Sequence, residues 1–200
     1  MNFLAHILLA PDTEARVGAL LGDFVKATTE AEFGPVIHRE ILLHRKIDGF
    51  TDSHPAVRAA KALFRRETRR FAGILLDVFY DHLLARDWAR YCARPLPDFV
   101  REFYRDAERY RARFPPPFAR AFDSMVADDW LQSYRTFAGV QETVQRIGMR
   151  RPKFVAPLGE GLADLHDHDA MIAADFGKFF AELSCYTEQC RASCSTAGRS

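Results

Sequence analysis

The sequence has almost no excess of charge, few cysteines and no long apolar run, and each shortage excludes a class of protein. The 28 basic residues face 27 acidic ones, so no overall field draws the chain to nucleic acid or to a membrane surface. The apolar residues 1–10 are too few to span a bilayer, lack the basic flank of a signal peptide and run into Pro11. The four cysteines match no common disulfide or zinc framework. We therefore expect a cytoplasmic protein without nucleic-acid or membrane partners, and the sequence leaves its oligomeric state open.

Strand-like alternation, internal repeats and low-complexity blocks are also absent from the sequence. Apolar residues recur instead at helical spacing, for example over residues 17–25, after a plausible N-cap at Asp12. A chain of 200 residues with 48% hydrophobic content can build one sizeable core. The sequence therefore predicts a single all-α domain over residues 1–190, followed by a disordered tail over residues 191–200.

Several catalytic motifs are missing as well, since there is no glycine-rich phosphate loop, nucleophile elbow or papain-type Cys/His pair. Two groups of acids and imidazoles stand out instead. The first lies in LHRKIDGFTDSHP, residues 43–55, where a spacing of i, i+4 and i+8 would place three side chains on one helical face. The second lies in the otherwise apolar GILLDVFYDHLLA, residues 73–85. Together the groups contain His44, Asp48, Asp52, His54, Asp77, Asp81 and His82.

Charged groups at positions where the pattern predicts core must be paired, hydrogen-bonded or bound to a metal ion. Carboxylates and imidazoles suit Mn²⁺, Mg²⁺, Fe and Zn²⁺, and two such groups close in sequence favour one metal site. The alternative is that Asp77 and Asp81 form caps or ion pairs with Arg45, Arg58 or Arg86.

Two further groups of residues are weaker candidates for a site. His6 and Asp23 stand in apolar segments, where a single polar residue is commonly structural, so they matter only if the fold brings them to the two groups. The run ADLHDHDA, residues 163–170, resembles a metal site by composition. However, consecutive helical residues point in different directions, and acids suit the N-terminus of a helix.

Two stripes of basic residues recur at helical spacing. Most such stripes are solvated faces with acidic neighbours one turn away. The alternative is a docking surface for an acidic protein or for a phosphate-bearing substrate. The stripes consist of Arg101, Arg105, Arg109 and Arg113, and of Arg58, Lys61, Arg65 and Arg69.

Five segments resemble the bacterial acyl carrier protein phosphodiesterases: MNFLAH, LLGDFVK, LHRKIDGFTDSHP, GILLDVFYDHLLARDW and DDWLQSY. The similarity runs in order from Met1 to about Phe180. That family resembles a divergent branch of the HD-type metal-dependent phosphohydrolases, so the resemblance implies an HD-like helical fold. It also implies Mn²⁺-dependent hydrolysis, with Mg²⁺ or Fe²⁺ as alternatives. The bond cleaved would be the phosphodiester between phosphopantetheine and a serine of holo-acyl carrier protein, an acidic protein substrate.

The resemblance implies a role for each acid and imidazole in a matching segment. The order Asp81–His82 departs from the usual His–Asp pair, which leaves the ligand set open. His6, His54 and His82 would assist proton transfer to the departing serine oxygen, with Asp52 as a further catalytic residue. Arg45 and Arg58 would hold the phosphate. The expected metal ligands are Asp23, His44, Asp48, Asp77 and Asp81.

Two other functions compete with this one. An HD-type phosphohydrolase acting on nucleotides would share the metal site but would have a closed pocket and no need of a basic face. A non-catalytic helical interaction module would use the acids and imidazoles only as a buried polar network. It would bind no metal, and substitution of Asp77 or Asp81 would cost it little but stability.

Overall fold

The computed structural model describes residues 3–26, 33–150 and 152–197, and within these ranges all regular structure is helical. The predicted all-α fold is therefore confirmed. Short 3₁₀ turns join some of the helices. The α-helices are α1 (Phe3–Leu9), α2 (Thr13–Leu21), α3 (Pro35–Ser53), α4 (Pro55–Ala62), α5 (Ala72–Arg86), α6 (Leu96–Ala107), α7 (Pro116–Ala127), α8 (Trp130–Ser133), α9 (Phe137–Met149) and α10 (Val155–Ala197).

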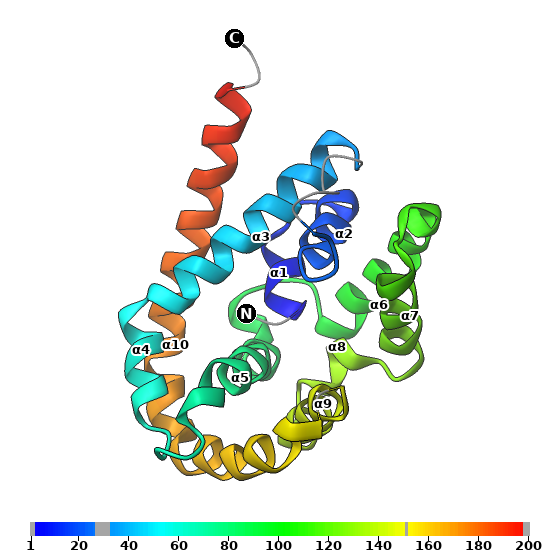
Figure 1. Ribbon diagram of the computed structural model, residues 1–200. Helices are drawn as coiled ribbons and strands as arrows, with labels where there is room; N and C mark the ends of the chain where they lie inside the picture. The colour runs from blue at the N-terminus through cyan, green and yellow to red at the C-terminus, as the bar shows by residue number, and fades with distance from the viewer. Residues whose placement is uncertain (1–2, 27–32, 151, 198–200) are drawn as a thin grey trace.

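Helix α5 lies among α1, α4, α9 and α10, which pack against it, whereas α6 and α7 lie farther away (Figure 1). Its sequence is apolar on nearly all sides, which is typical of a helix buried all round, and most of its residues are buried. Helix α1 packs against it, and α10 runs past α9 and then along α4 and α3. The second acid/imidazole group therefore lies in the middle of the core. None of the described helices is long and apolar enough to cross a membrane.

The long helix α10 differs from the sequence prediction at its C-terminal end. Residues 191–200 are predicted to be disordered, whereas α10 continues to Ala197. Arg191 binds both carboxylate oxygens of the buried Glu40, with its Nη2 2.8 Å from Oε2, and donates to the carbonyl of Leu9. This long-range contact ties the end of α10 to α3 and α1. Residues 198–200 lie outside the described part of the chain.

Helices α2 and α3 approach each other closely because glycines stand at their contact. A Cβ atom on Gly18 would lie 2.8 Å from the carbonyl oxygen of Ile37 and 2.9 Å from Cβ of Glu40. Gly22, one turn later, faces α3 in the same way, and a Cβ there would lie 2.3 Å from Cγ of His44. The absence of side chains at these two positions sets the distance between the helices. It therefore also sets the position of the polar residues on α3.

We expect Gly18→Ala to destabilise the protein by about 1–3 kcal/mol, because the added methyl group overpacks a backbone contact. The control is Gly159→Ala on α10, where no atom lies within 4 Å of the added Cβ. There we expect a gain of about 0.5–1 kcal/mol from the higher helix propensity of alanine. Urea unfolding followed by circular dichroism measures both. A Gly18→Ala protein as stable as wild type would contradict the close packing of α2 and α3.

Candidate active site

Two buried histidines from different helices stack on each other at the centre of the site. The rings of His6 on α1 and His44 on α3 lie 3.9 Å apart between centroids, at an interplanar angle of 15°. Asp48, one helical turn after His44, lies beside both rings. Its Oδ1 is 3.2 Å from Nε2 of His6, and its Oδ2 is 3.1 Å from Nε2 of His44. These three residues offer ligand atoms within 4.8 Å of one another, a spacing that can hold a metal ion.

Asp23 joins this group from the segment that follows α2. Its Oδ1 lies 3.3 Å from Nε2 of His44, and its side chain is about half exposed. Gly22 makes room for the His44 ring, which would otherwise meet a Cβ atom. His6, Asp23, His44 and Asp48 are called the four-residue cluster below. The sequence names all four as candidates, and the fold brings them together.

The backbone fixes the orientation of the His44 ring. Nδ1 of His44 lies 2.7 Å from the carbonyl oxygen of Ala19 and donates its proton to that oxygen. Such a contact leaves Nε2, which faces both carboxylates, as the nitrogen available to a metal ion. Nδ1 of His6 is buried without a hydrogen-bond partner in the described part of the chain. The His6 ring is therefore held by the stack and by Asp48.

Burial and the two carboxylates push the pKa values of the two imidazoles apart. Burial, together with the charge on His44, lowers the pKa of His6 to about 4. For His44, burial acts in the same direction, but hydrogen bonds to Asp23 and Asp48 raise its pKa to about 9. Burial would raise the pKa of each carboxyl group, yet the hydrogen bonds from the imidazoles lower the pKa of Asp48 and of Asp23. At neutral pH the cluster holds two carboxylates, one imidazolium and one neutral imidazole.

Asp81 of α5 binds the start of α1, the helix that carries His6. Its Oδ2 accepts the N–H of Leu4 at 2.7 Å, and its Oδ1 accepts the N–H of Ala5 at 3.0 Å. The side chain is completely buried, and this burial raises its pKa to about 7 against the effect of the two N–H groups. Asp81 thus anchors the helix that carries His6.

Asp77 stands one turn before Asp81 on α5. Burial raises its pKa, and the charges on Asp48 and Asp52 raise it further. Because those charges reach it, Asp77 faces the same region as the four-residue cluster. The ligand atoms that lie within 4.8 Å of one another belong to His6, His44 and Asp48, and Asp77 is not among these residues.

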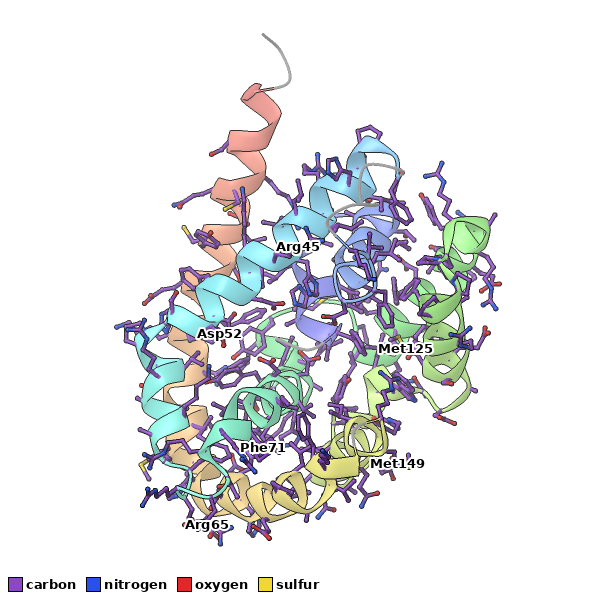
Figure 2. The ribbon with its side chains drawn as sticks, viewed as in Figure 1. Arg45, Asp52, Arg65, Phe71, Met125 and Met149 are labelled. Atoms are coloured by element: carbon purple, nitrogen blue, oxygen red, sulfur yellow. The ribbon has the colours of Figure 1, made fainter. Side chains whose placement is uncertain are left out.

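Three of the expected catalytic residues, Asp52, His54 and His82, make contacts outside the four-residue cluster. Asp52 is exposed near the end of α3 (Figure 2), and its Oδ1 binds Nζ of Lys61 at 2.7 Å. His54 caps α4 through Nδ1, and its Nε2 lies 3.0 Å from Oε2 of Glu182. Nδ1 of His82 donates to the carbonyl of Tyr134 at 2.7 Å. None of the three belongs to the four-residue cluster.

The two arginines expected to hold phosphate lie apart from each other. Arg45, midway along α3, donates to the carbonyl of Val25 at 3.2 Å (Figure 2). Arg58 is exposed on α4. The alternative that the α5 acids form caps is confirmed for Asp81, which accepts the N–H groups of Leu4 and Ala5. Arg86 pairs with Asp169 and Asp87.

The other charged runs in the sequence have structural partners. In residues 163–170, the buried Asp164 binds Nε of Arg65 at 2.6 Å and also contacts Thr68. The basic stripes are largely paired with acids one turn away or on a neighbouring helix, as the simpler interpretation predicts. The pairs are Arg101–Asp98, Arg105–Asp106, Arg109–Asp106, Arg113–Glu14, Lys61–Asp52 and Arg65–Asp164.

A pocket of about 270 Å³ opens beside the four-residue cluster, and Asp23 lines it. Trp130, a buried residue of the core, lines it too. The sequence analysis overlooks Arg146 and Arg150, which line the pocket from α9 and just beyond its end. Their spacing of four, with Thr143 and Ile147 on the same face, is the signal that could have identified them.

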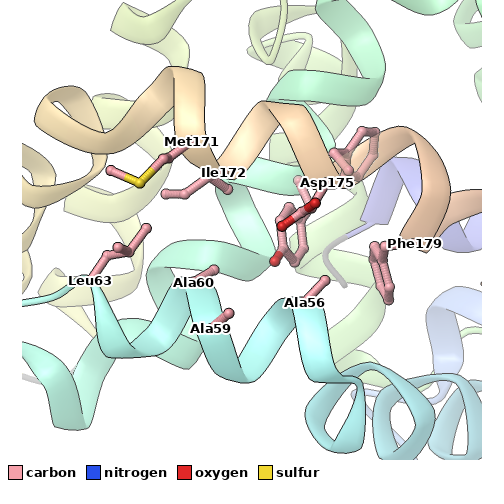
Figure 3. A pocket seen from close by; sticks show the side chains of 10 residues that line it. Ala56, Ala59, Ala60, Leu63, Met171, Ile172, Asp175 and Phe179 are labelled. Carbon is pink, nitrogen blue, oxygen red and sulfur yellow. The ribbon is translucent and has the colours of Figure 1, made fainter.

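A second pocket, of about 110 Å³, lies between α4 and α10 (Figure 3). Alanines such as Ala56 and Ala60 line it, together with apolar residues of α10, and Asp175 is its one charged residue within the described chain. It contains no member of the four-residue cluster. The pocket beside Asp23 is therefore the one that belongs to the site.

Fold and site together define an all-helical protein with a buried cluster of two imidazoles and two carboxylates. Residues 1–183 match the family model of the acyl carrier protein phosphodiesterases. Relatives named acyl carrier protein phosphodiesterase, from Enterobacter sp. (strain 638) and Escherichia coli O157:H7, are 36% and 37% identical over 185 residues, which cover 92% of this chain and 95% of theirs. The chain belongs to the acyl carrier protein phosphodiesterase family, as the resemblance indicates. No solved structure matches it, so the HD-like fold stays a prediction.

We expect the free energy of unfolding of the metal-free protein to fall as the pH rises from 6.5 through about 9, because the pKa of His44 is raised from 6.5 to about 9 on folding. The folded protein binds this proton more tightly, so the stabilisation is complete below the lower value and is lost above the upper one. Unfolding by urea in EDTA at a series of pH values measures it. His44→Gln should remove this part of the pH dependence, and identical slopes in both proteins would contradict the assignment.

Proposed function

We propose that this protein is a metal-dependent phosphodiesterase that hydrolyses the bond between phosphopantetheine and the serine of holo-acyl carrier protein. The products would be apo-acyl carrier protein and phosphopantetheine. The observation that carries the proposal is the four-residue cluster, found in a chain that belongs to the acyl carrier protein phosphodiesterase family. A cytoplasmic location, where such a substrate would be met, stays a prediction.

The residues of the cluster fit a divalent cation. Nε2 of His44 and Nε2 of His6 both face Asp48, so a cation between them would replace the protons that they now share with the carboxylate. Mixed nitrogen and oxygen ligands suit Mn²⁺ or Fe²⁺, whereas Mg²⁺ prefers oxygen alone. The ligands in the proposal are His6, Asp23, His44, Asp48 and Asp77.

Asp77 and Asp81 have different tasks in this proposal. The repulsion that raises the pKa of Asp77 comes in part from Asp48, and a cation between these carboxylates would relieve it. Asp81 differs because both of its oxygens already accept backbone N–H groups. We therefore assign Asp81 the positioning of α1 and His6 and replace its expected role as a ligand.

A bound cation would supply the Lewis acidity that activates a water molecule and offsets charge on the phosphoryl oxygens. The chain's own residues contribute orientation, since Ala19 holds the ring of His44 and Asp81 holds α1. Asp52 lies one turn beyond Asp48, and its charge also reaches Asp77. Its side chain is exposed and bound to Nζ of Lys61, however, so we assign no step to it. We assign no step to His54 or His82, which are bound to Glu182 and to the Tyr134 carbonyl.

We expect Asp48→Asn to lower the Mn²⁺-dependent conversion of holo- to apo-acyl carrier protein on the order of 100-fold or more, because both imidazoles lose a carboxylate partner and the cation loses a ligand. A gel-shift assay of holo-acyl carrier protein with and without Mn²⁺ measures the reaction, and bound Mn²⁺ is measured alongside. The matched control is Asp167→Asn, an exposed acid in the run 163–170 on α10, which should behave as wild type.

Two outcomes would count against the proposal in different ways. No conversion by folded, Mn²⁺-loaded wild type would refute the reaction and favour a nucleotide or another small phosphoester as substrate. Full activity in Asp48→Asn, with loss in Asp167→Asn, would move the metal site to α10.

A further inference from the structure

The pocket beside Asp23 shares one side chain with the four-residue cluster. Asp23 lines the pocket, and its Oδ1 lies 3.3 Å from Nε2 of His44. A ligand that fills the pocket therefore reaches the cluster through this carboxylate. With a cation bound there, one end of the ligand would meet positive charge.

The opposite wall of the pocket is basic. Thr143, Arg146, Ile147 and Arg150 share one face of α9 and its end, since they are spaced i, i+3, i+4 and i+7, and all four line the pocket. The guanidinium carbon of Arg146 lies 4.6 Å from the centroid of the Trp130 ring, and its Nη2 donates to Oγ1 of Thr143 at 2.7 Å.

This pairing leaves donors of Arg146 available to a ligand. A guanidinium stacked on an aromatic face and bound to one hydroxyl group is held in place without being neutralised. Within the described ranges no carboxylate forms an ion pair with Arg146 or with Arg150, in contrast to the two basic stripes. These cations can therefore bind an anion or carbonyl oxygens.

Aromatic rings form the remaining wall. The ring centroid of Phe3 lies 6.5 Å from that of Trp130 and 6.5 Å from that of Phe24, at interplanar angles of 17° and 20°. Three nearly parallel rings present an extended apolar surface. The pocket thus offers apolar contact along its length and hydrogen-bond donors at its basic side.

We propose that this pocket receives the phosphopantetheine arm of the acyl carrier protein and that Arg146 is a substrate-binding residue. The inference rests on the proposed function and adds the site at which the substrate would bind. The phosphodiester end would lie at Asp23 and the cluster. The aliphatic chain would lie against Phe3, Phe24 and Trp130. The donors of Arg146 and Arg150 would face the amide carbonyl groups of the arm.

Two variants test the pocket by different physical means. Arg146→Met removes the charge but keeps the length of the side chain, and Ile147→Trp fills the pocket. Gln145→Trp, on the exposed face of α9, is the control for bulk, and Arg66→Met, an exposed arginine in the turn after α4, is the control for charge. Circular dichroism and Mn²⁺ affinity establish that each protein is folded and binds the cation.

The first measurement is the binding of free 4′-phosphopantetheine to the Mn²⁺-loaded protein by calorimetry. The second is the hydrolysis of holo-acyl carrier protein, and the third is the hydrolysis of bis(p-nitrophenyl) phosphate, a diester without the arm. We expect Arg146→Met and Ile147→Trp to weaken 4′-phosphopantetheine binding and to raise KM for holo-acyl carrier protein on the order of tenfold or more. Turnover of the small diester should stay within about twofold, since it does not need the arm.

The outcomes separate this inference from the proposed function. Unchanged 4′-phosphopantetheine binding and unchanged KM in both variants would overturn the pocket assignment. The proposed reaction would still stand if the wild type converts holo-acyl carrier protein. Failure of the wild type to bind 4′-phosphopantetheine would also overturn it. If Arg146→Met lowered the hydrolysis of both substrates equally, Arg146 would be needed to maintain the structure of the four-residue cluster. That result would refute a role in holding the arm. Failure of Mn²⁺-loaded wild type to convert holo-acyl carrier protein would instead refute the proposed function.

Discussion

The contact on which the site depends is the one between the carboxylate of Asp81 and the first N–H groups of α1. Helix α1 has seven residues, too few to be stable alone, and the N–H groups of its first turn have no partner within the helix. Asp81 accepts two of them, from Leu4 and Ala5. Because Asp81 stands on the central helix α5, this contact fixes α1 to the middle of the core. It thereby fixes His6, whose ring stacks on His44.

A second constraint is electrostatic, because the two stacked imidazoles cannot both be charged at 3.9 Å in a buried site. The carboxylates of Asp23 and Asp48 resolve this conflict by placing the proton on His44, so that the pKa values separate to about 4 for His6 and about 9 for His44. Such an arrangement keeps several ionisable groups away from water, which costs stability unless they compensate one another. A protein that needed only stability would fill the same space with apolar residues. In the proposed function, a bound cation would gather the same four side chains.

Much of the fold follows from local spacing, whereas the site follows from it only in part. Spacing predicts the helices, the burial of α5 and the pairing of His44 with Asp48, which are four residues apart. It fails for Asp52 because eight residues rotate a helix by about 80° beyond two full turns, so Asp52 points to solvent and to Lys61. Spacing also fails for His82, because consecutive residues of a helix point about 100° apart and His82 directly follows Asp81. The contacts Asp81–Leu4 and Arg191–Glu40 join residues that are 77 and 151 positions apart, and no local pattern encodes them. For the same reason, the sequence alone makes His6 and Asp23 only weaker candidates, which matter if the fold brings them to the other groups.

The distribution of charge separates two kinds of basic surface. The stripes on α4 and α6 and the turns beyond them look basic in sequence, but their cations lie beside carboxylates such as Asp98, Asp106 and Glu14. Alternating charges of this kind cancel within a Debye length and steer a partner only weakly. The pocket beside Asp23 has only two basic residues, Arg146 and Arg150, which line it together. The Trp130 ring orients Arg146, and no acid within the described chain neutralises it. In the proposed function, the substrate is an acidic carrier protein with a single anionic arm. Two arginines without an ion-pair partner next to the cluster would orient such a substrate better than a longer stripe whose arginines already form ion pairs. The physics of screening thus favours the end of α9 over either stripe as the side from which the substrate enters.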